Sequence, residues 1–100
     1  MKKALLLLCL FSTSSAFAIS PADLAKAKNC FACHAPDKKL IGPSYKEVAA
    51  KYKTDANAVT KLADKIKKGG SGVWGSMPMP PNAVSDAEAK DLAKWILSLK

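Results

Sequence analysis

The sequence contains one histidine, three cysteines and no arginine, and these shortages exclude several kinds of site. A tetrahedral zinc site normally needs four protein ligands, and this chain cannot supply them if Cys9 belongs to a segment that is removed. Proteins that bind nucleic acid often interleave aromatic residues with arginine, and no such interleaving is present. A zinc module and a nucleic-acid-binding domain are therefore both disfavoured.

The sequence also lacks the strict apolar–polar alternation that is typical of β-strands, and it contains no internal repeat or low-complexity tract. Apolar residues recur instead at helical spacing. Four helices are predicted, over 20–32, 44–53, 55–68 and 86–99, and together they indicate one all-α domain. The residues predicted to form their buried faces are Leu24, Ala27, Phe31, Tyr45, Val48, Ala49, Tyr52, Val59, Leu62, Ala63, Ile66, Ala89, Leu92, Trp95, Ile96 and Leu99.

The first eighteen residues have the pattern of a secretory signal peptide. Lys2 and Lys3 precede the apolar run 4–11, and Ala16-Phe17-Ala18 has the form of a cleavage site. The run is shorter than the roughly 20 residues that a membrane-spanning helix needs. We therefore expect residues 1–18 to be removed on export, leaving 19–100 as the mature domain. A lipidated Cys9 is disfavoured because three leucines precede it.

The most informative motif is Cys30-Phe31-Ala32-Cys33-His34, which has the spacing Cys-x-x-Cys-His. This spacing is the attachment signature of a c-type haem, in which two thiols bond to the porphyrin and the histidine binds iron. Residues three apart share one face of a helical turn, so both thiols can reach one macrocycle. A redox dithiol is the alternative, but a thioredoxin-like fold would need strands around the motif.

A covalently bound haem would also enlarge the hydrophobic core of a short chain. The mature chain has only 82 residues, and chains of this length bury a modest core. No disulfide remains available once Cys30 and Cys33 are attached to the porphyrin. We therefore expect the haem to serve as the centre of the core, with the helices packed around it.

Proline and glycine are concentrated in the segment 69–82, which predicts a rigid loop. Methionine is a common axial ligand opposite histidine, and both Met77 and Met79 are available here. Met79 is favoured because Pro78 and Pro80 flank it. Trp74 either donates its indole N–H toward a haem propionate or only packs.

A second proline, Pro43, is a candidate for orienting the histidine. A ligating histidine usually donates its other ring N–H to a carbonyl group, and the Pro43 carbonyl lies in a predicted rigid loop shortly after His34. A simple turn proline is the alternative. The sequence alone does not separate the two.

Basic residues exceed acidic ones. Without Lys2 and Lys3, 14 lysines stand against 8 acidic residues, a net charge near +6. A basic surface of this kind either steers the protein toward acidic partners or simply keeps it soluble.

The sequence resembles the short bacterial class I cytochromes c of the c-551/c-552 type. The resemblance rests on Cys-x-x-Cys-His, Ile-Gly-Pro, Gly-Val-Trp-Gly, Pro-Met-Pro-Pro-Asn and a final Leu-Ala-Lys-Trp-Ile-Leu helix, in this order. It implies a fold of four to five short helices around one covalently bound haem c. It also implies thioether bonds at Cys30 and Cys33 and axial ligation by His34 and Met79.

The same resemblance assigns supporting residues. Pro43 would accept the ring N–H of His34, and Asn82 would donate toward the Met79 sulfur. Trp74 and Lys65 would contact the inner propionate. Some relatives carry arginine at the position of Lys65, so a bidentate contact is lost here.

In function, the resemblance implies a periplasmic monomer that carries single electrons and is not an enzyme. Its partners would be a membrane cytochrome complex as donor and a nitrite reductase, peroxidase or oxidase as acceptor, each with an acidic docking surface. Neither nucleic acid nor a place within the membrane is expected. The rival is an enzyme or gas sensor with an open iron site, in which Met79 does not bind iron.

Overall fold

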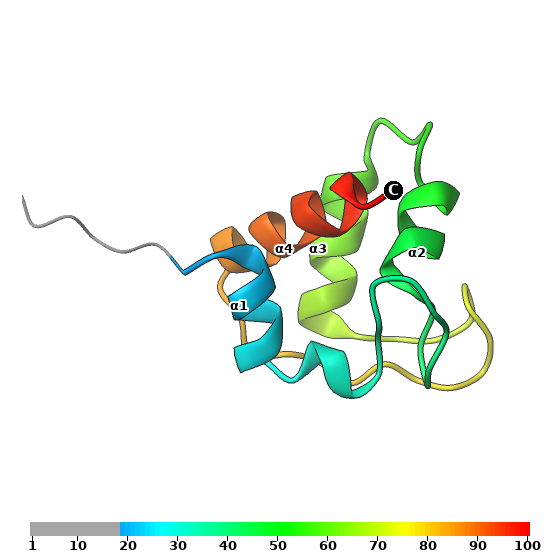
Figure 1. Cartoon of the computed structure of the whole chain (residues 1–100), viewed down its shortest axis with the longest axis horizontal. Helices are drawn as coiled ribbons and strands as arrows, with labels where there is room; N and C mark the ends of the chain where they lie inside the picture. Colours follow the sequence, from blue (N-terminus) through cyan, green and yellow to red (C-terminus); the bar gives the residue numbers. More distant parts are fainter. Residues whose placement is uncertain (1–18) are drawn as a thin grey trace, which may run out of the picture.

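A computed structural model describes residues 19–100, and within this range the chain is helical (Figure 1). The predicted signal peptide, 1–18, lies outside the described residues. Between 19 and 100, no helix is long and apolar enough to cross a membrane. The elements are α1 (Pro21–Ala27), a short 3-10 helix η1 (Cys30–Ala32), α2 (Tyr45–Lys51), α3 (Ala58–Lys68) and α4 (Asp86–Ser98).

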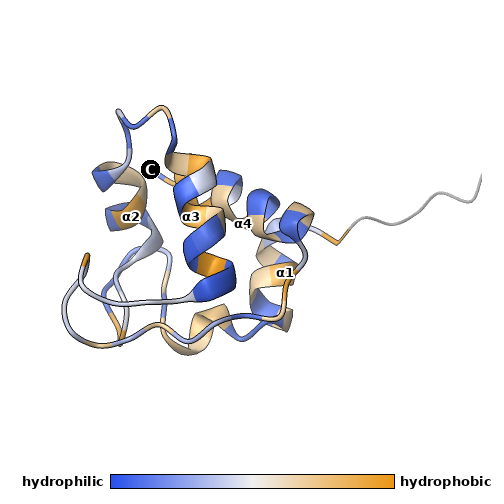
Figure 2. Cartoon of the chain, turned by 180° about the vertical axis from the view of Figure 1, so that it is seen from behind, coloured by the Kyte–Doolittle hydropathy of each residue, from blue (hydrophilic) through white to orange (hydrophobic). Residues whose placement is uncertain are grey.

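The last helix, α4, organises the core because α1, α2 and α3 all pack against it. Figure 1 shows α4 crossing both α1 and α3. Ala89 and Ala93 have no exposed surface, and their small side chains allow the neighbouring helices to approach closely. In Figure 2, α3 alternates between hydrophobic and hydrophilic turns, as expected for a helix with one buried face.

Most of the predicted apolar faces are buried or half-buried, but one prediction in the first helix is wrong. Ala27 is exposed, and Ala25 is buried in its place with 1% of its surface accessible. The buried cluster consists of Leu24, Ala25, Tyr45, Val48, Leu62, Ala63, Ile66, Ala89, Leu92, Ala93 and Ile96.

The first helix also ends earlier than predicted. It stops at Ala27, Lys28 caps it, and Asn29 has φ of 62° in the left-handed region. Asparagine tolerates this conformation better than most residues, so the chain changes direction there. Cys30 is consequently carried by the separate turn η1 instead of by the last turn of a long helix.

The helix termini follow local capping chemistry. Ser44 and Ser85 each form a complete capping box, with Glu47 and Glu88 respectively. The third helix begins later than its predicted start at Asp55. The Asp55 carboxylate accepts the Asn57 N–H at 2.8 Å and pairs with Lys61 at 2.6 Å, and the Lys61 ammonium lowers the pKa of Asp55. Asn57 is the cap, so α3 begins three residues after Asp55.

Candidate functional site

The Cys-x-x-Cys-His motif forms a tight turn. The Cys30 carbonyl accepts the N–H of Cys33 at 3.2 Å and the N–H of His34 at 3.0 Å. Both cysteines are half-buried and carry free thiols, and the His34 ring is half-buried beside them. The turn therefore presents two thiols and one imidazole together, as the spacing predicts.

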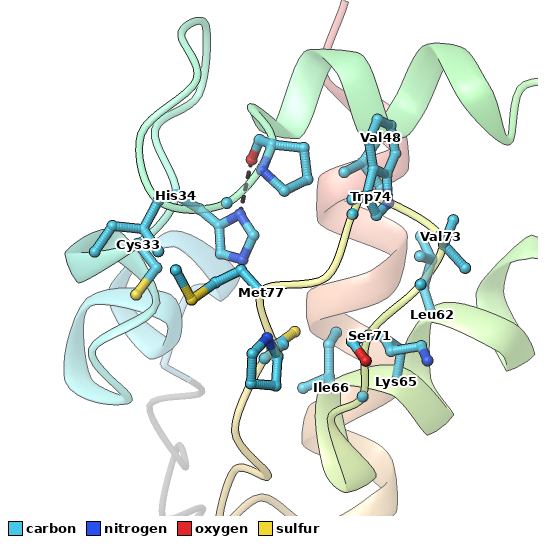
Figure 3. A pocket seen from close by; sticks show the side chains of 18 of the residues that line it. Cys33, His34, Val48, Leu62, Lys65, Ile66, Ser71, Val73, Trp74 and Met77 are labelled. Atoms are coloured by element: carbon cyan, nitrogen blue, oxygen red, sulfur yellow. Dashed lines mark hydrogen bonds between the residues drawn. The ribbon is translucent and has the colours of Figure 1, made fainter.

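The His34 imidazole is oriented by the segment that follows it. Its Nδ1 lies 2.7 Å from the Pro43 carbonyl oxygen, the contact drawn as a dashed line in Figure 3. Because a carbonyl can only accept, Nδ1 carries the proton, and the lone pair of Nε2 is left free to bind a metal. The hydrogen bond expected of Pro43 is thus present.

Gly42 contributes to the same arrangement by having no side chain. A Cβ at this position would stand 2.4 Å from the His34 Cε1, closer than any real contact. The Gly42 N–H also donates to the Cys33 carbonyl at 2.8 Å. The segment before Pro43 can therefore lie against the imidazole only with glycine here.

Two adjoining hollows open beside the motif. The smaller is lined by Cys30, Cys33, His34 and Met79 together. The larger shares Cys33, His34 and Met79 and extends between α2, α3 and the loop 69–82 (Figure 3). Its walls are mostly apolar. This lining suits a large apolar group whose metal takes an imidazole nitrogen and a thioether sulfur as ligands.

The structure distinguishes the two candidate methionines. Met79 is half-buried and lines both hollows, whereas Met77 is 69% exposed and lines only the larger one. An isolated β-bridge also holds the Met79 backbone. Its N–H donates to the Gly70 carbonyl at 2.9 Å, and its carbonyl accepts the Gly70 N–H at 3.0 Å. Flanking prolines alone do not reveal this contact.

The three supporting residues differ in their placement. Lys65 and Trp74 both line the larger hollow, and the Lys65 ammonium lies over Gly70 at the start of the loop. Asn82 lines the smaller one, but its amide does not donate to the Met79 sulfur as expected. It donates to the Ile66 carbonyl at 2.9 Å and the Pro80 carbonyl at 3.4 Å. A carbonyl is the stronger acceptor, so Asn82 joins the loop to α3.

The tip of the loop 69–82 is attached to α2 by an aromatic contact. The Lys51 ammonium lies 5.4 Å from the centre of the Trp74 ring, within the range of a cation–π interaction. We predict that Lys51→Met lowers the free energy of unfolding by about 0.5–1 kcal/mol, measured by denaturant titration. Lys53→Met, an exposed lysine beyond the end of α2, is the control. Equal losses in both variants would contradict the contact.

The alternatives to a haem site find no support in the described residues. Burial raises the pKa of the Cys30 thiol, whereas reactive dithiols need a lowered one. Among residues 19–100, no group of three His, Cys, Asp or Glu side chains is placed to hold a metal ion, as zinc would require. Neither observation favours dithiol exchange or zinc binding at this turn.

Sequence reasoning missed three contributors to the site. Gly69 and Gly70 were predicted only as part of the loop 69–82. Gly69 ends α3, and both glycines contact the Met79–Pro80 backbone. Tyr45 was expected only to line the core, and its ring lies on that of His34. One glycine suffices to end a helix, so the presence of two was the signal in the sequence that this segment has a further role.

Comparisons with known proteins agree on one family. The family model described as cytochrome c matches residues 22–100. The chain is 59% identical over 85 residues to cytochrome c-551 of Pseudomonas aeruginosa, covering 85% of this chain and 82% of that protein. It is 63% identical over 78 residues to cytochrome c-552 of Hydrogenobacter thermophilus, covering 78% and 80%. The crystal structure of Nitrosomonas europaea cytochrome c552 is 61% identical, with a TM-score of 0.76, covering 79% of this chain and 99% of that one.

Proposed function

The chain belongs to the cytochrome c family, and we propose that it is a periplasmic carrier of single electrons whose iron is bound by His34 and Met79. Membership of this family brings one covalently bound haem c and a role as a small electron carrier. The observation that carries the finer proposal is that Cys30, Cys33, His34 and Met79 line one hollow. Export by the predicted signal peptide, residues 1–18, would place the protein in the periplasm.

When bound, haem c supplies an iron that gains and loses one electron. Cys30 and Cys33 hold the group through thioether bonds, which fix it against the turn η1. His34 offers Nε2 to the iron while Nδ1–H remains on the Pro43 carbonyl. That hydrogen bond keeps one tautomer in both oxidation states and raises the basicity of the ligand.

Met79 is the second axial ligand in this proposal. Its thioether is soft and uncharged, so it favours the ferrous state and raises the reduction potential. The bridge to Gly70 holds its backbone at the end of α3, so the ligand need not move when the charge on iron changes. Lys65 and Trp74 are proposed to contact the inner propionate, since both line the same hollow.

The surrounding residues also support an electron carrier rather than an enzyme. The chain has no histidine besides His34 and no arginine, so neither can assist peroxide or gas chemistry at an open iron position. The family is cytochrome c, and the relatives are cytochromes c-551 and c-552. A closed site with both axial positions filled has no place for a substrate.

Redox partners are proposed to dock where the hollow opens. Its rim carries exposed apolar side chains from two loops, and the chain has a large excess of lysine. A membrane cytochrome complex as donor and a nitrite reductase, peroxidase or oxidase as acceptor would offer acidic surfaces to it. Attraction of this kind speeds encounter and is screened by salt. The exposed rim residues are Ile41, Val73, Trp74 and Met77.

An absorption spectrum of the mature protein tests the proposal. We expect a low-spin c-type spectrum in both oxidation states, a methionine-to-ferric-iron charge-transfer band, and no change on adding carbon monoxide to the reduced protein. A shift with carbon monoxide would indicate the open-site enzyme or sensor instead. Absence of any haem spectrum would overturn the proposal altogether.

A further inference from the structure

The His34 imidazole stacks on the ring of Tyr45, a residue that the sequence predicts only as part of the core. The centres of the His34 and Tyr45 rings are 5.3 Å apart, and their planes differ by 22°. Tyr45 is 3% exposed and lines both hollows. The stacked pair therefore lies inside the proposed haem site and not beside it.

The ring of Tyr45 is itself firmly held. It is the first residue of α2, directly after the Ser44 capping box, and its N–H donates to the Ala35 carbonyl at 3.0 Å. Trp95 and Phe31 pack edge-on against it, with ring centres at 5.3 and 5.9 Å. These contacts connect Tyr45 to α4 and to η1, so its ring plane is set by the helix packing.

The known hydrogen bond alone does not fix the imidazole. A bond from Nδ1 to the Pro43 carbonyl defines one direction, and it still allows the ring to rock about that direction. Gly42 closes the space beside Cε1, and the Tyr45 ring covers the flat face. Three contacts of different kinds together leave a single ring orientation.

We propose that Tyr45 is a positioning residue that sets the plane of the His34 imidazole at the iron. The proposal rests on the proposed function, because it takes His34 to be an axial ligand. The direction of an axial imidazole plane, together with the orientation of the other axial ligand, determines how unpaired spin is distributed over the porphyrin of ferric haem. Tyr45 would thereby influence the electronic structure of the carrier without touching the iron.

The test is proton NMR of the holoprotein in both oxidation states. Tyr45→Leu removes the flat face, and we expect it to change the order of the ferric haem-methyl resonances. Tyr45→Phe keeps the face and should retain the wild-type order. Leu24→Ala is the control for lost core packing, because Leu24 is buried in α1 and lines neither hollow. It should also keep the order.

An unchanged order in Tyr45→Leu, or an equal change in Leu24→Ala, would overturn the proposal. If Tyr45→Leu does not yield folded holoprotein, Tyr45→Met takes its place in the same comparison. The wild-type protein provides a second test, because ring protons of His34 and Tyr45 should show a nuclear Overhauser effect in the ferrous state. Its absence overturns the proposal without any variant.

The same spectra distinguish a failure of this proposal from a failure of the proposed axial ligation by His34 and Met79. Ferrous wild-type protein should show His34 ring protons and a Met79 methyl group shifted far upfield by the porphyrin. If these signals are missing, the axial ligation is wrong. If they are present and Tyr45→Leu leaves the ferric pattern unmoved, only the role of Tyr45 is wrong.

Discussion

Met79→Ala is expected to lower the reduction potential and to make the reduced iron reactive toward carbon monoxide. Loss of the thioether would remove the proposed ligand that favours ferrous iron and would open its position to added ligands. Axial ligands tune haem potentials over about 0.8 V, so a fall of roughly 0.1 V or more is expected. Potentiometric titration and carbon monoxide spectra measure the two effects.

Met77→Ala is the matched control because it removes the same side chain two residues away. Met77 is largely exposed and lines only the larger hollow, so its loss should leave the potential and the carbon monoxide response as they were. Similar small changes in both variants would refute the assignment of Met79. A large change in Met77→Ala alone would transfer the ligand role to Met77.

The choice between the two methionines shows how much of the site the sequence alone can predict. Flanking prolines favour Met79, and the structure supports that choice for a reason the prolines do not contain. The Met79 backbone pairs with Gly70, nine residues earlier, and this pairing depends on how the chain folds back beyond α3. Contacts between residues distant in sequence depend on the whole fold, so local patterns cannot reveal them.

Helix boundaries were predictable wherever capping was local. The predicted start of α4 holds because Ser85 and Glu88 complete their capping box within four residues. The predicted end of the first helix at Ala32 fails because Asn29 adopts a left-handed conformation. Apolar spacing continues through that point, since Phe31 packs on the core from the separate turn η1. Periodicity therefore predicted the burial of Phe31 correctly, but it predicted the continuity of the helix wrongly.

Residue roles taken from resemblance depend on side-chain direction, which the sequence does not contain. The contact expected of Pro43 is present because its carbonyl belongs to the backbone, whose course the Ile-Gly-Pro segment constrains. Asn82 has a free side chain, and its amide reaches the Ile66 carbonyl instead of the Met79 sulfur. Both residues line the site, but only the backbone group was predictable in detail.

Gly69→Ala is expected to destabilise the protein strongly and to disturb the iron site as well. Gly69 has φ of 69° and ψ of −159°, a region essentially restricted to glycine, so alanine there costs about 1–3 kcal/mol in strain alone. A Cβ would also stand 2.2 Å from the Met79 carbonyl oxygen. That oxygen must move, and its hydrogen bond from the Gly70 N–H is lost with it.

Gly72→Ala is the control that distinguishes the effect of backbone strain from the effect of contact with the Met79 carbonyl. Gly72 has φ of 105°, so alanine is strained there too, but a Cβ would meet no atom within 4 Å. Gly72→Ala should therefore lose stability through strain only and keep the wild-type potential. Gly69→Ala should lose more stability and shift the potential in the same direction as Met79→Ala. Denaturant unfolding and potentiometry of both holoproteins measure this difference. Equal losses and equal potentials would mean that the contact between the end of α3 and Met79 does not hold the ligand, because strain alone would then account for both variants.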